Sequence, residues 1–282
     1  MAHRARLLGG PVDVADHDEV IAFIAGAVGA GRKAIVGNQN LHSLCLSRTD
    51  AAMRDFFAAA DLIEIDSMPL LQWGRLMGLR LSEAHRCTYL DWRERFWDLA
   101  ARRRWRVFCL GAAAPTNAAA LERLGRAFPG AVLGGRHGYF DHARGAHESR
   151  AVVAAINAFR PDVLLVGMGM PLQEKWIAEH YGDLVSGVVL SVGGAFDYEA
   201  GVQKPAPRIY GRLCLEWLYR LAHEPRRLGR RYLIEPWSLI GPAAEDLARA
   251  FRRRPARRPA FGYRLAVGAE EAAAEDDLPR AA

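Results

Sequence analysis

Residues 162–176, DVLLVGMGMPLQEKW, combine the pattern of a buried strand with groups that could bind a polar ligand. The run from Val163 to Val166 is apolar and long enough for a strand buried on both faces of a sheet. Gly167 and Gly169 allow a tight turn and a close ligand approach, and Pro171 suits the first turn of a helix. Unpaired N–H groups meet at a helix start, so the segment predicts a site for an anionic or hydroxyl-rich ligand. The alternative is that the glycines only make a tight strand-to-helix turn.

Polar side chains also follow other predicted strands. In open parallel sheets, ligands bind just beyond the carboxyl ends of the strands. A loop with a purely structural role does not need amides and carboxylates at each of these ends. We therefore expect one edge of the sheet to gather Asn38, Asn40, Asp66, His137, Gln173 and Asp197.

The elements that would position these residues alternate between strand and helix patterns. Strands separated by helix-length segments indicate βαβ units with right-handed crossovers. The predicted fold is therefore α/β, with a mostly parallel, doubly wound (Rossmann-like) sheet covered on both faces. Its predicted strands are Lys33–Gly37, Leu62–Ile65, Arg106–Leu110, Ala131–Gly134, Asp162–Val166 and Gly187–Ser191, and its predicted helices include Asp16–Ala30, Leu41–Ala60, Pro69–Leu79, Asp91–Arg104, Asn117–Phe128 and His147–Phe159.

Composition and missing motifs exclude several classes. Hydrophobic residues are 51% and charged residues 25% of the chain, as in globular proteins, and no apolar run could span a bilayer. No signal peptide is recognisable, so we expect a cytoplasmic location. The four cysteines form no CxxC pair, which argues against a zinc site or a disulfide framework. The glycine loops lack the third glycine of a dinucleotide fingerprint, and no GxxxxGK[ST] loop is present.

Positive charge is concentrated near the C-terminus. Residues 223–258 hold ten arginines against four acidic residues, a balance equal to the net charge of +6 of the whole chain. The division that this predicts is an α/β core at 1–205, an amphipathic basic helical segment at 206–254, and a disordered tail at 255–282. Trp237, Leu239 and Ile240 lie among these arginines, which favours a membrane interface over nucleic acid as the anionic partner. An ordinary helix packed against the core is the alternative.

Several separate motifs, in order, resemble the WecG/TagA/CpsF family of bacterial glycosyltransferases (glycosyltransferase family 26). The resemblance covers about residues 10–240. Two departures are Asn38-Gln-Asn40, where the family usually has Thr-x-Asn, and Ile65-Asp66-Ser67, where it commonly has Pro-Asp-Gly. Within the family, IDSMPLLQWGRLMG, TYLDW and LIEPW resemble the xanthan-type lipid-linked glucosyltransferase branch. The matching motifs are NQNLHSL (38–44), ADLIEIDSMPL (60–70), HGYFD (137–141), DVLLVGMGMPLQEKW (162–176), VGGAFDYEAG (192–201), LEWLYRL (215–221) and EPRRLGRRYL (224–233).

The resemblance implies an inverting transfer of a hexose, with glucose as the sugar this branch indicates, from a UDP-sugar to a monosaccharide on polyprenyl diphosphate in exopolysaccharide synthesis. Such an enzyme would work peripherally on the inner face of the cytoplasmic membrane. The alternative within the family is an N-acetylmannosamine or N-acetylmannosaminuronate transferase of teichoic acid or surface-antigen synthesis. Sugar identity, acceptor and a homo-oligomeric state remain open.

Roles follow from the resemblance and from the chemistry of an inverting transfer, which needs a carboxylate to take the acceptor's proton. Asp66 is the predicted base, with the alternative that it caps the following helix. Arg86 is expected to support the acceptor site, or else to form a surface ion pair. Neither a metal nor another cofactor is predicted, since no DxD motif follows a strand and arginines could neutralise UDP. The predicted acceptor site is Asn38, Asn40, Arg86 and Gln173; the donor site is Gly111, His137, Gly138, Gly167, Gly169, Gln173, Gly193, Gly194 and Asp197; lipid or diphosphate would contact Arg220, Arg226, Arg227, Arg230 and Arg231.

Two other classes fit the sequence less well. A nucleic-acid-binding protein would spread basic and aromatic residues over one face and carry a reader motif. The carboxylates expected at the strand ends would instead repel a phosphate backbone, so no nucleic-acid partner is predicted. A nucleotide-dependent oxidoreductase would need the dinucleotide fingerprint that the glycine loops lack.

Overall fold

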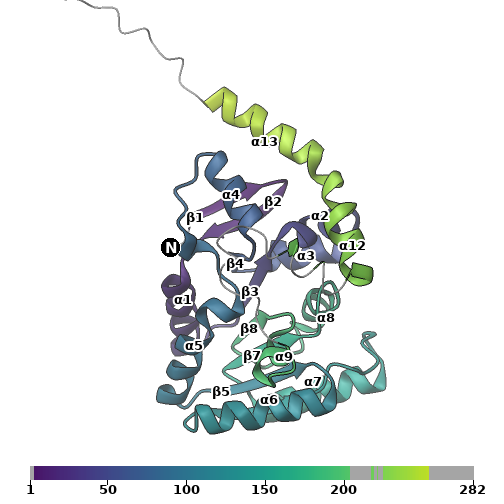
Figure 1. Ribbon diagram of the computed structural model, residues 1–282. Helices are drawn as coiled ribbons and strands as arrows, with labels where there is room; N and C mark the ends of the chain where they lie inside the picture. Colours follow the sequence, from purple (N-terminus) through teal and green to yellow (C-terminus); the bar gives the residue numbers. More distant parts are fainter. Residues whose placement is uncertain (1–2, 204–216, 219–220, 222–224, 254–282) are drawn as a thin grey trace, which may run out of the picture.

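A six-stranded parallel sheet forms the centre of the molecule (Figure 1). The computed structural model describes residues 3–203, 217–218, 221 and 225–253. The strand order is β4-β3-β8-β7-β5-β6, and every neighbouring pair is parallel. The predicted α/β fold is confirmed, and all six predicted strands are present with small shifts at their ends. They are β3 (Ala34–Gln39), β4 (Leu62–Ile65), β5 (Arg106–Gly111), β6 (Val132–Arg136), β7 (Val163–Gly167) and β8 (Val188–Ser191).

The direction of each crossover decides which face its helix covers. A right-handed β-helix-β connection puts the helix on one face when the chain moves one way along the sheet, and on the other face when it moves back. The β5-to-β6 connection therefore places its helix opposite to the helices of the β6-to-β7 and β7-to-β8 connections. One hydrophobic core contains residues of α1 (His17–Gly29), α5 (Tyr89–Arg103), α6 (Ala114–Ala127) and α9 (Ala195–Glu199), and the other contains residues of α3 (Ala51–Ala59), α7 (His147–Phe159) and α8 (Leu172–His180).

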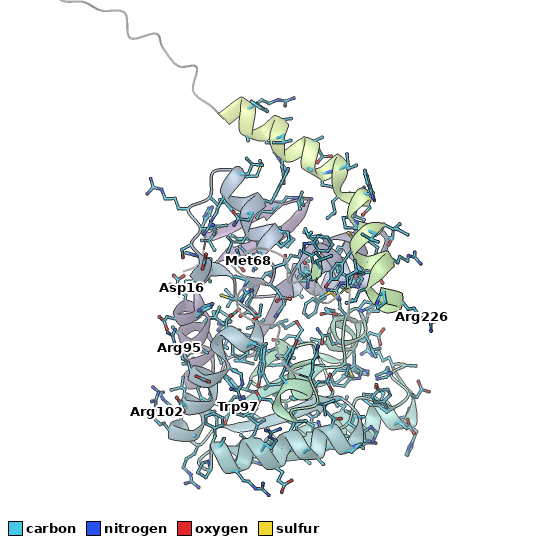
Figure 2. The ribbon with its side chains drawn as sticks, in the orientation of Figure 1. Asp16, Met68, Arg95, Trp97, Arg102 and Arg226 are labelled. Atoms are coloured by element: carbon cyan, nitrogen blue, oxygen red, sulfur yellow. The ribbon has the colours of Figure 1, made fainter. Side chains whose placement is uncertain are left out.

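Both cores are apolar and aromatic. Alternate residues of β7 point to opposite faces, so Val163 and Leu165 join one core while Leu164 and Val166 join the other. Figure 2 shows Trp97 on the inner side of α5, where its indole ring is fully buried. A strand that is buried on both faces is apolar along its whole length, which explains why the apolar run of β7 predicts a strand so clearly.

The predicted helix Leu41–Ala60 is two helices. Asp50 ends α2 (Leu41–Thr49) with an extended backbone, φ −111° and ψ 114°, and begins α3. Its side chain accepts a hydrogen bond from the N–H of Ala52 at 3.1 Å, which caps α3. An aspartate within a helical pattern can compete for backbone N–H groups in this way, and here the cap prevails over continuation of the helix.

An N-terminal hairpin covers the edge of the sheet, and the sequence did not predict it. Strands β1 (His3–Leu7) and β2 (Gly10–Val14) pair antiparallel around Leu8 and Gly9, which both have positive φ. The carboxylate of Asp13 accepts the N–H of Ile63 at 2.8 Å, so an edge donor of β4 is satisfied by a side chain. Arg4 in turn pairs with Asp13 through two nitrogens at 2.9 and 2.8 Å.

The described part of the C-terminal segment packs against this hairpin. Asp246 of α13 (Ile240–Arg253) is buried and accepts the N–H of Leu8 at 2.7 Å and the indole N–H of Trp73 at 2.9 Å. Trp73 belongs to α4 (Met68–Leu76), so α13 lies at the end of the molecule that holds β1, β2 and α4 (Figure 1). Before α13 come α12 (Pro225–Leu233) and the 3-10 helix η2 (Glu235–Leu239). Most of residues 206–224 of the predicted helical segment, and the predicted tail at 255–282, lie outside the described residues.

The role of Asp13 can be tested by its removal. We expect Asp13→Ala to lower the free energy of unfolding by about 1–3 kcal/mol, because the buried N–H of Ile63 loses its acceptor. Asp18→Ala is the matched control, since its ion pair with Arg95 joins two exposed side chains. Urea denaturation of both variants gives the comparison, and equal stability of the two would contradict this account of the edge.

Candidate active site

The carboxyl ends of the parallel strands gather most of the predicted site residues. The helix after β5 covers one face of the sheet and the helix after β7 covers the other, although the two strands are neighbours. Ligands bind at such reversals in open α/β sheets. The predicted residues therefore divide into a carboxylate side at β3 and β4 and a glycine side at β5, β7 and β8.

On the carboxylate side, Asp66 and Asn40 are in contact. Asp66 follows β4 directly and is half-buried, and its main-chain N–H donates to the carbonyl of Gln39 at 2.9 Å. The amide of Asn40 donates to Oδ2 of Asp66 at 3.1 Å. Asn40 also begins α2, where its Oδ1 accepts the N–H of Ser43 at 3.1 Å. The helix cap thus fixes an amide that holds the carboxylate in place.

The alternative that Asp66 caps the next helix is wrong. α4 begins at Met68, and its N-cap residue is Ser67. Asp66 lies one residue before the cap, and its contact with Asn40 points to the strand-end site. That position places the Asp66 carboxylate at the carboxyl ends of the strands, where the predicted general base is expected.

Glu64 is a site residue that the sequence reasoning missed. It is 1% exposed, and one of its oxygens accepts the amide N–H of Asn38 at 3.0 Å. Asn38 also donates to the main-chain oxygen of Ser191 at 2.9 Å, so both of its amide hydrogens are committed within the protein. The side chain of Asn38 therefore ties β3 to β4 and β8, and only its oxygen remains for the predicted contact with the acceptor. A glutamate within a short, otherwise apolar strand was the available signal.

The Glu64 carboxyl is held in an environment that favours its neutral form. Burial raises its pKa well above the usual value, and the negative charge of Asp66 raises it further. Trp92 lies close, but its indole N–H does not reach hydrogen-bonding geometry, and Oε1 of Glu64 has no partner within the described chain. Glu64 lies within β4 and Asp66 directly follows it, so the nearby charge of Asp66 adds to burial in favouring the neutral form of Glu64.

Arg86 lies beside this cluster and forms an ion pair. A β-bridge joins Ile65 to Arg86, which sets the loop next to β4. The guanidinium donates to Asp91 at 3.0 Å, and the main-chain oxygen of Arg86 contacts the ring of His17 at 2.7 Å. The structure thus places Arg86 near the acceptor side and also shows the ion pair that was its alternative. Its contact with an acceptor stays a prediction.

On the glycine side, three of the predicted donor residues are needed for packing. A Cβ atom added at Gly111 would lie 2.1 Å from the oxygen of Gly167, and one at Gly167 would lie 2.7 Å from the oxygen of Gly193. At Gly138 it would lie 2.9 Å from Met168 Cγ and 3.0 Å from the Cα of Gly111. These glycines allow neighbouring segments to approach each other closely, and their predicted contact with the donor stays a prediction.

Gly169 and Gly193 differ, because an added Cβ would meet no atom within 4 Å. Both have positive φ, +81° and +55°. Both belong to the predicted donor site, but in the structure their N–H groups donate to Oε1 of Gln173, at 3.3 and 3.1 Å. The open Cα side of each turn remains available to a ligand, whereas the N–H groups are already bound.

Gln173 binds both of these turns through a side chain that is itself buried. Its side chain is 2% exposed, and its amide nitrogen donates to Glu174 at 2.7 Å. The predicted direct contact with sugar hydroxyls is therefore less favoured than a positioning role for Gln173.

The remaining predicted donor residues border the same loops. Burial raises the pKa of Asp197, and its carboxylate lies next to Gly194, whose added Cβ would be 3.4 Å from Oδ2. His137 accepts the N–H of Tyr139 at 3.3 Å, which stabilises its own turn, and Tyr139 is 75% exposed. Contacts of these residues with a nucleotide stay predictions.

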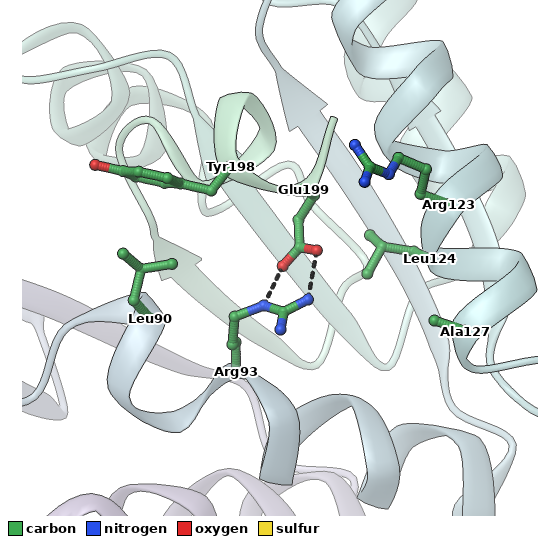
Figure 3. A pocket seen from close by; sticks show the side chains of 7 residues that line it. All are labelled: Leu90, Arg93, Arg123, Leu124, Ala127, Tyr198 and Glu199. Atoms are coloured by element: carbon green, nitrogen blue, oxygen red, sulfur yellow. Dashed lines mark hydrogen bonds and ion pairs between the residues drawn. The ribbon is translucent and has the colours of Figure 1, made fainter. Parts of the chain in front are cut away.

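A cavity of about 350 Å³ lies away from these strand-end groups, between α5, α6 and α9 (Figure 3). The guanidinium of Arg93 binds both carboxylate oxygens of Glu199 at 2.6 Å, and Tyr89 donates to the same carboxylate at 2.5 Å. Arg123 donates to the oxygen of Ala200 at 2.7 Å. These contacts fix α9, which begins just after Gly194. The wall of the cavity therefore supports the turn at Gly193 and Gly194, two residues of the predicted donor site.

The predicted arginines of the C-terminal segment differ in how exposed they are. Arg226 is exposed at the start of α12 and points away from the body (Figure 2). Arg230 is also exposed, whereas Arg231 is partly buried. Burial lowers the pKa of His42, and the charge of Arg231 lowers it further, which places Arg231 near α2. Arg220 and the side chain of Arg227 lie outside the described residues.

Exposed apolar side chains accompany these arginines. Trp237 is 70% exposed and Phe251 66%, and Leu233, Ile234 and Ile240 are also exposed. Within the described ranges, no helix is long and apolar enough to cross a membrane. Arginines beside exposed aromatic and aliphatic residues are typical of a segment that lies on a membrane interface.

Comparison with known proteins agrees with the resemblance. The family model described as "Glycosyl transferase WecG/TagA/CpsF family" matches residues 5–253. Relatives from Staphylococcus aureus strains MRSA252 and MW2 are each 36% identical over 147 residues, which is 52% of this chain. Both bear the name N-acetylglucosaminyldiphosphoundecaprenol N-acetyl-beta-D-mannosaminyltransferase, and the alignment spans 56% of their length. Neither name supports the predicted glucosyltransferase branch. The chain belongs to the WecG/TagA/CpsF family of glycosyltransferases.

Proposed function

We propose that this glycosyltransferase moves a sugar from a UDP-sugar to a sugar carried on polyprenyl diphosphate, with inversion at the anomeric carbon and Asp66 as the general base. The contact between Asn40 and Asp66 carries the proposal, because it holds a half-buried carboxylate at the carboxyl ends of β3 and β4. The open turns at Gly169 and Gly193 border the same edge of the sheet and offer room for the donor.

For the transferred sugar, N-acetylmannosamine is favoured over the glucose that the sequence motifs indicated. The S. aureus relatives are named as N-acetylmannosaminyltransferases that act on a lipid-linked N-acetylglucosamine. Purified protein assayed with UDP-N-acetylmannosamine and UDP-glucose, each with polyprenyl-diphosphate N-acetylglucosamine and polyprenyl-diphosphate glucose, decides between them. Transfer from UDP-glucose alone would restore the original prediction.

In the proposed reaction, an acceptor hydroxyl loses its proton to Asp66 while its oxygen attacks the anomeric carbon. The bond from that carbon to the UDP oxygen breaks, and UDP leaves with the electron pair. Asn40 keeps the carboxylate oriented, since its amide donates to Oδ2 of Asp66, and a carboxylate so held is the group that would take the proton. Because the Gly169 and Gly193 N–H groups are bound to Gln173, arginines of the C-terminal segment remain the proposed partners of the diphosphate.

Asp66→Asn tests the base directly. An amide keeps the volume but cannot accept the proton, so we expect the rate of transfer to fall by about 10²–10⁴-fold while UDP binding is retained. Exposed Asp55→Asn is the control and should leave the rate unchanged. If Asp66→Asn kept more than about a tenth of the wild-type rate, Asp66 would not be the base.

Glu64→Gln tests whether the buried partner acts as a neutral group. The folded pKa of Glu64 is raised, so its ionisation costs stability, and that cost grows as the pH rises above the unfolded value. We expect Glu64→Gln to keep kcat/KM within about threefold at pH 7 and to resist heat at least as well as wild type at pH 8. Exposed Glu83→Gln serves as the control. A loss above about tenfold at pH 7 would show that an ionised Glu64 is required.

The proposed membrane contact is tested by placing negative charges on its exposed apolar side chains. Ile240→Glu combined with Phe251→Glu changes only exposed side chains, so folding should be preserved. Full burial of one such side chain stabilises by about 1.5–3 kcal/mol, and we expect the double variant to bind anionic vesicles at least about tenfold more weakly. Val185→Glu, also at an exposed site, is the control. Unchanged vesicle sedimentation would leave α13 as a structural helix only.

A further inference from the structure

Glu174 is a buried carboxyl at the start of α8 that the proposed reaction does not use. Its side chain is fully buried, and one oxygen accepts the amide N–H of Gln173 at 2.7 Å. The other oxygen has no hydrogen-bond partner within the described residues. Burying a carboxyl group with so few partners costs stability, which points to a role beyond packing.

The partner of Glu174 connects it to both open glycine turns. Oε1 of Gln173 accepts the N–H of Gly169 at 3.3 Å and the N–H of Gly193 at 3.1 Å. Gly169 follows β7 and Gly193 follows β8, so a single amide joins the turns of two neighbouring strands. Glu174 lies two hydrogen bonds away from each turn.

We propose that Glu174 is a positioning residue for donor binding: its carboxyl orients the Gln173 amide, and that amide holds the Gly169 and Gly193 turns against which the nucleotide-sugar binds. The inference rests on the proposed function, because that function assigns these turns to the donor. A carboxylate that accepts from the Gln173 nitrogen polarises the amide, and its oxygen then binds the two N–H groups more strongly.

The charge of Glu174 changes near neutral pH. Burial raises its pKa to about 7, while the hydrogen bond from Gln173 opposes the shift. Of the other titratable groups on α8, Glu179 is exposed, Lys175 pairs with Asp50 at 2.6 Å, and His180 bonds to Ser149 at 2.9 Å. None of these three shifts the pKa of Glu174. Above about pH 7 Glu174 accepts the Gln173 N–H as a charged carboxylate, and below it the neutral carboxyl accepts the same N–H more weakly.

The test measures UDP affinity by calorimetry and donor KM by steady-state kinetics, from pH 6 to pH 8. In wild type we expect both UDP dissociation constant and donor KM to be roughly fivefold to tenfold higher at pH 6 than at pH 8. In Glu174→Gln both should lose this pH dependence, while acceptor KM stays unchanged. Glu179→Gln, an exposed glutamate on the same helix, should behave as wild type.

A second measurement is independent of ligands. A raised folded pKa means that wild type loses stability relative to Glu174→Gln as the pH rises from about 4.5 to about 7, with no further loss above. We therefore expect the Tm of Glu174→Gln to exceed that of wild type by a few degrees, roughly, at pH 8, and the difference to shrink toward pH 4.5.

The outcomes separate this inference from the proposed function. If Glu174→Gln follows the wild-type pH profile of UDP affinity, the positioning role is wrong even though transfer occurs. If the profile is lost in Glu174→Gln but wild type transfers no sugar to a lipid-linked acceptor, the positioning role stands and the proposed reaction fails. A uniform rise in donor and acceptor KM without any change in pH dependence would indicate a merely structural glutamate and overturn the inference.

Discussion

The close approach of three backbones at the ends of β5, β7 and β8 is the constraint on which the site depends. At Gly111 and Gly167 the neighbouring main chain lies where a Cβ atom would be, so no other residue fits without moving a strand. This packing brings the turns after β7 and β8 near enough for one amide, that of Gln173, to bind an N–H from each. Gly169 and Gly193, in these two turns, keep open space on the side where a Cβ atom would stand.

Two buried carboxyls impose a related electrostatic constraint. Glu64 and Glu174 are both buried, and burial raises the pKa of each. The hydrogen-bond donors to these two carboxyls are amides and not cations: Asn38 donates to Glu64, and Gln173 donates to Glu174. An amide N–H can bind a carboxyl oxygen without placing a second charge in the buried site. Asp66, half-buried and held by Asn40, is thereby the natural position for the negative charge of its pair.

The sequence predicted the parts of the fold that depend on local patterns. The apolar run of β7 and the match of α7 to His147–Phe159 follow from burial on two faces and from helical periodicity. The break at Asp50 depended on a cap that competes with the helix, and the hairpin on an edge that only the assembled sheet presents. Within the site, strand ends predicted which residues gather, but not where each side chain points. Gln173 binds Gly193, which follows another strand, and Asn38 binds Glu64 and Ser191 of its two neighbouring strands; no spacing along one segment reveals such partners.

The C-terminal segment is attached to the same elements that carry the carboxylate side of the site. Glu235 of η2 pairs with His42 of α2 at 2.6 Å, and Asp246 of α13 binds the hairpin turn and Trp73 of α4. α2 begins at the cap residue Asn40, and α4 begins two residues after Asp66. Exposed apolar side chains and arginines on the segment are thus joined through two short helices to the amide and the carboxylate of the proposed reaction. A lipid-linked acceptor keeps its reacting sugar close to a membrane surface, so a surface-binding segment fixed to α2 and α4 would bring Asp66 to that sugar.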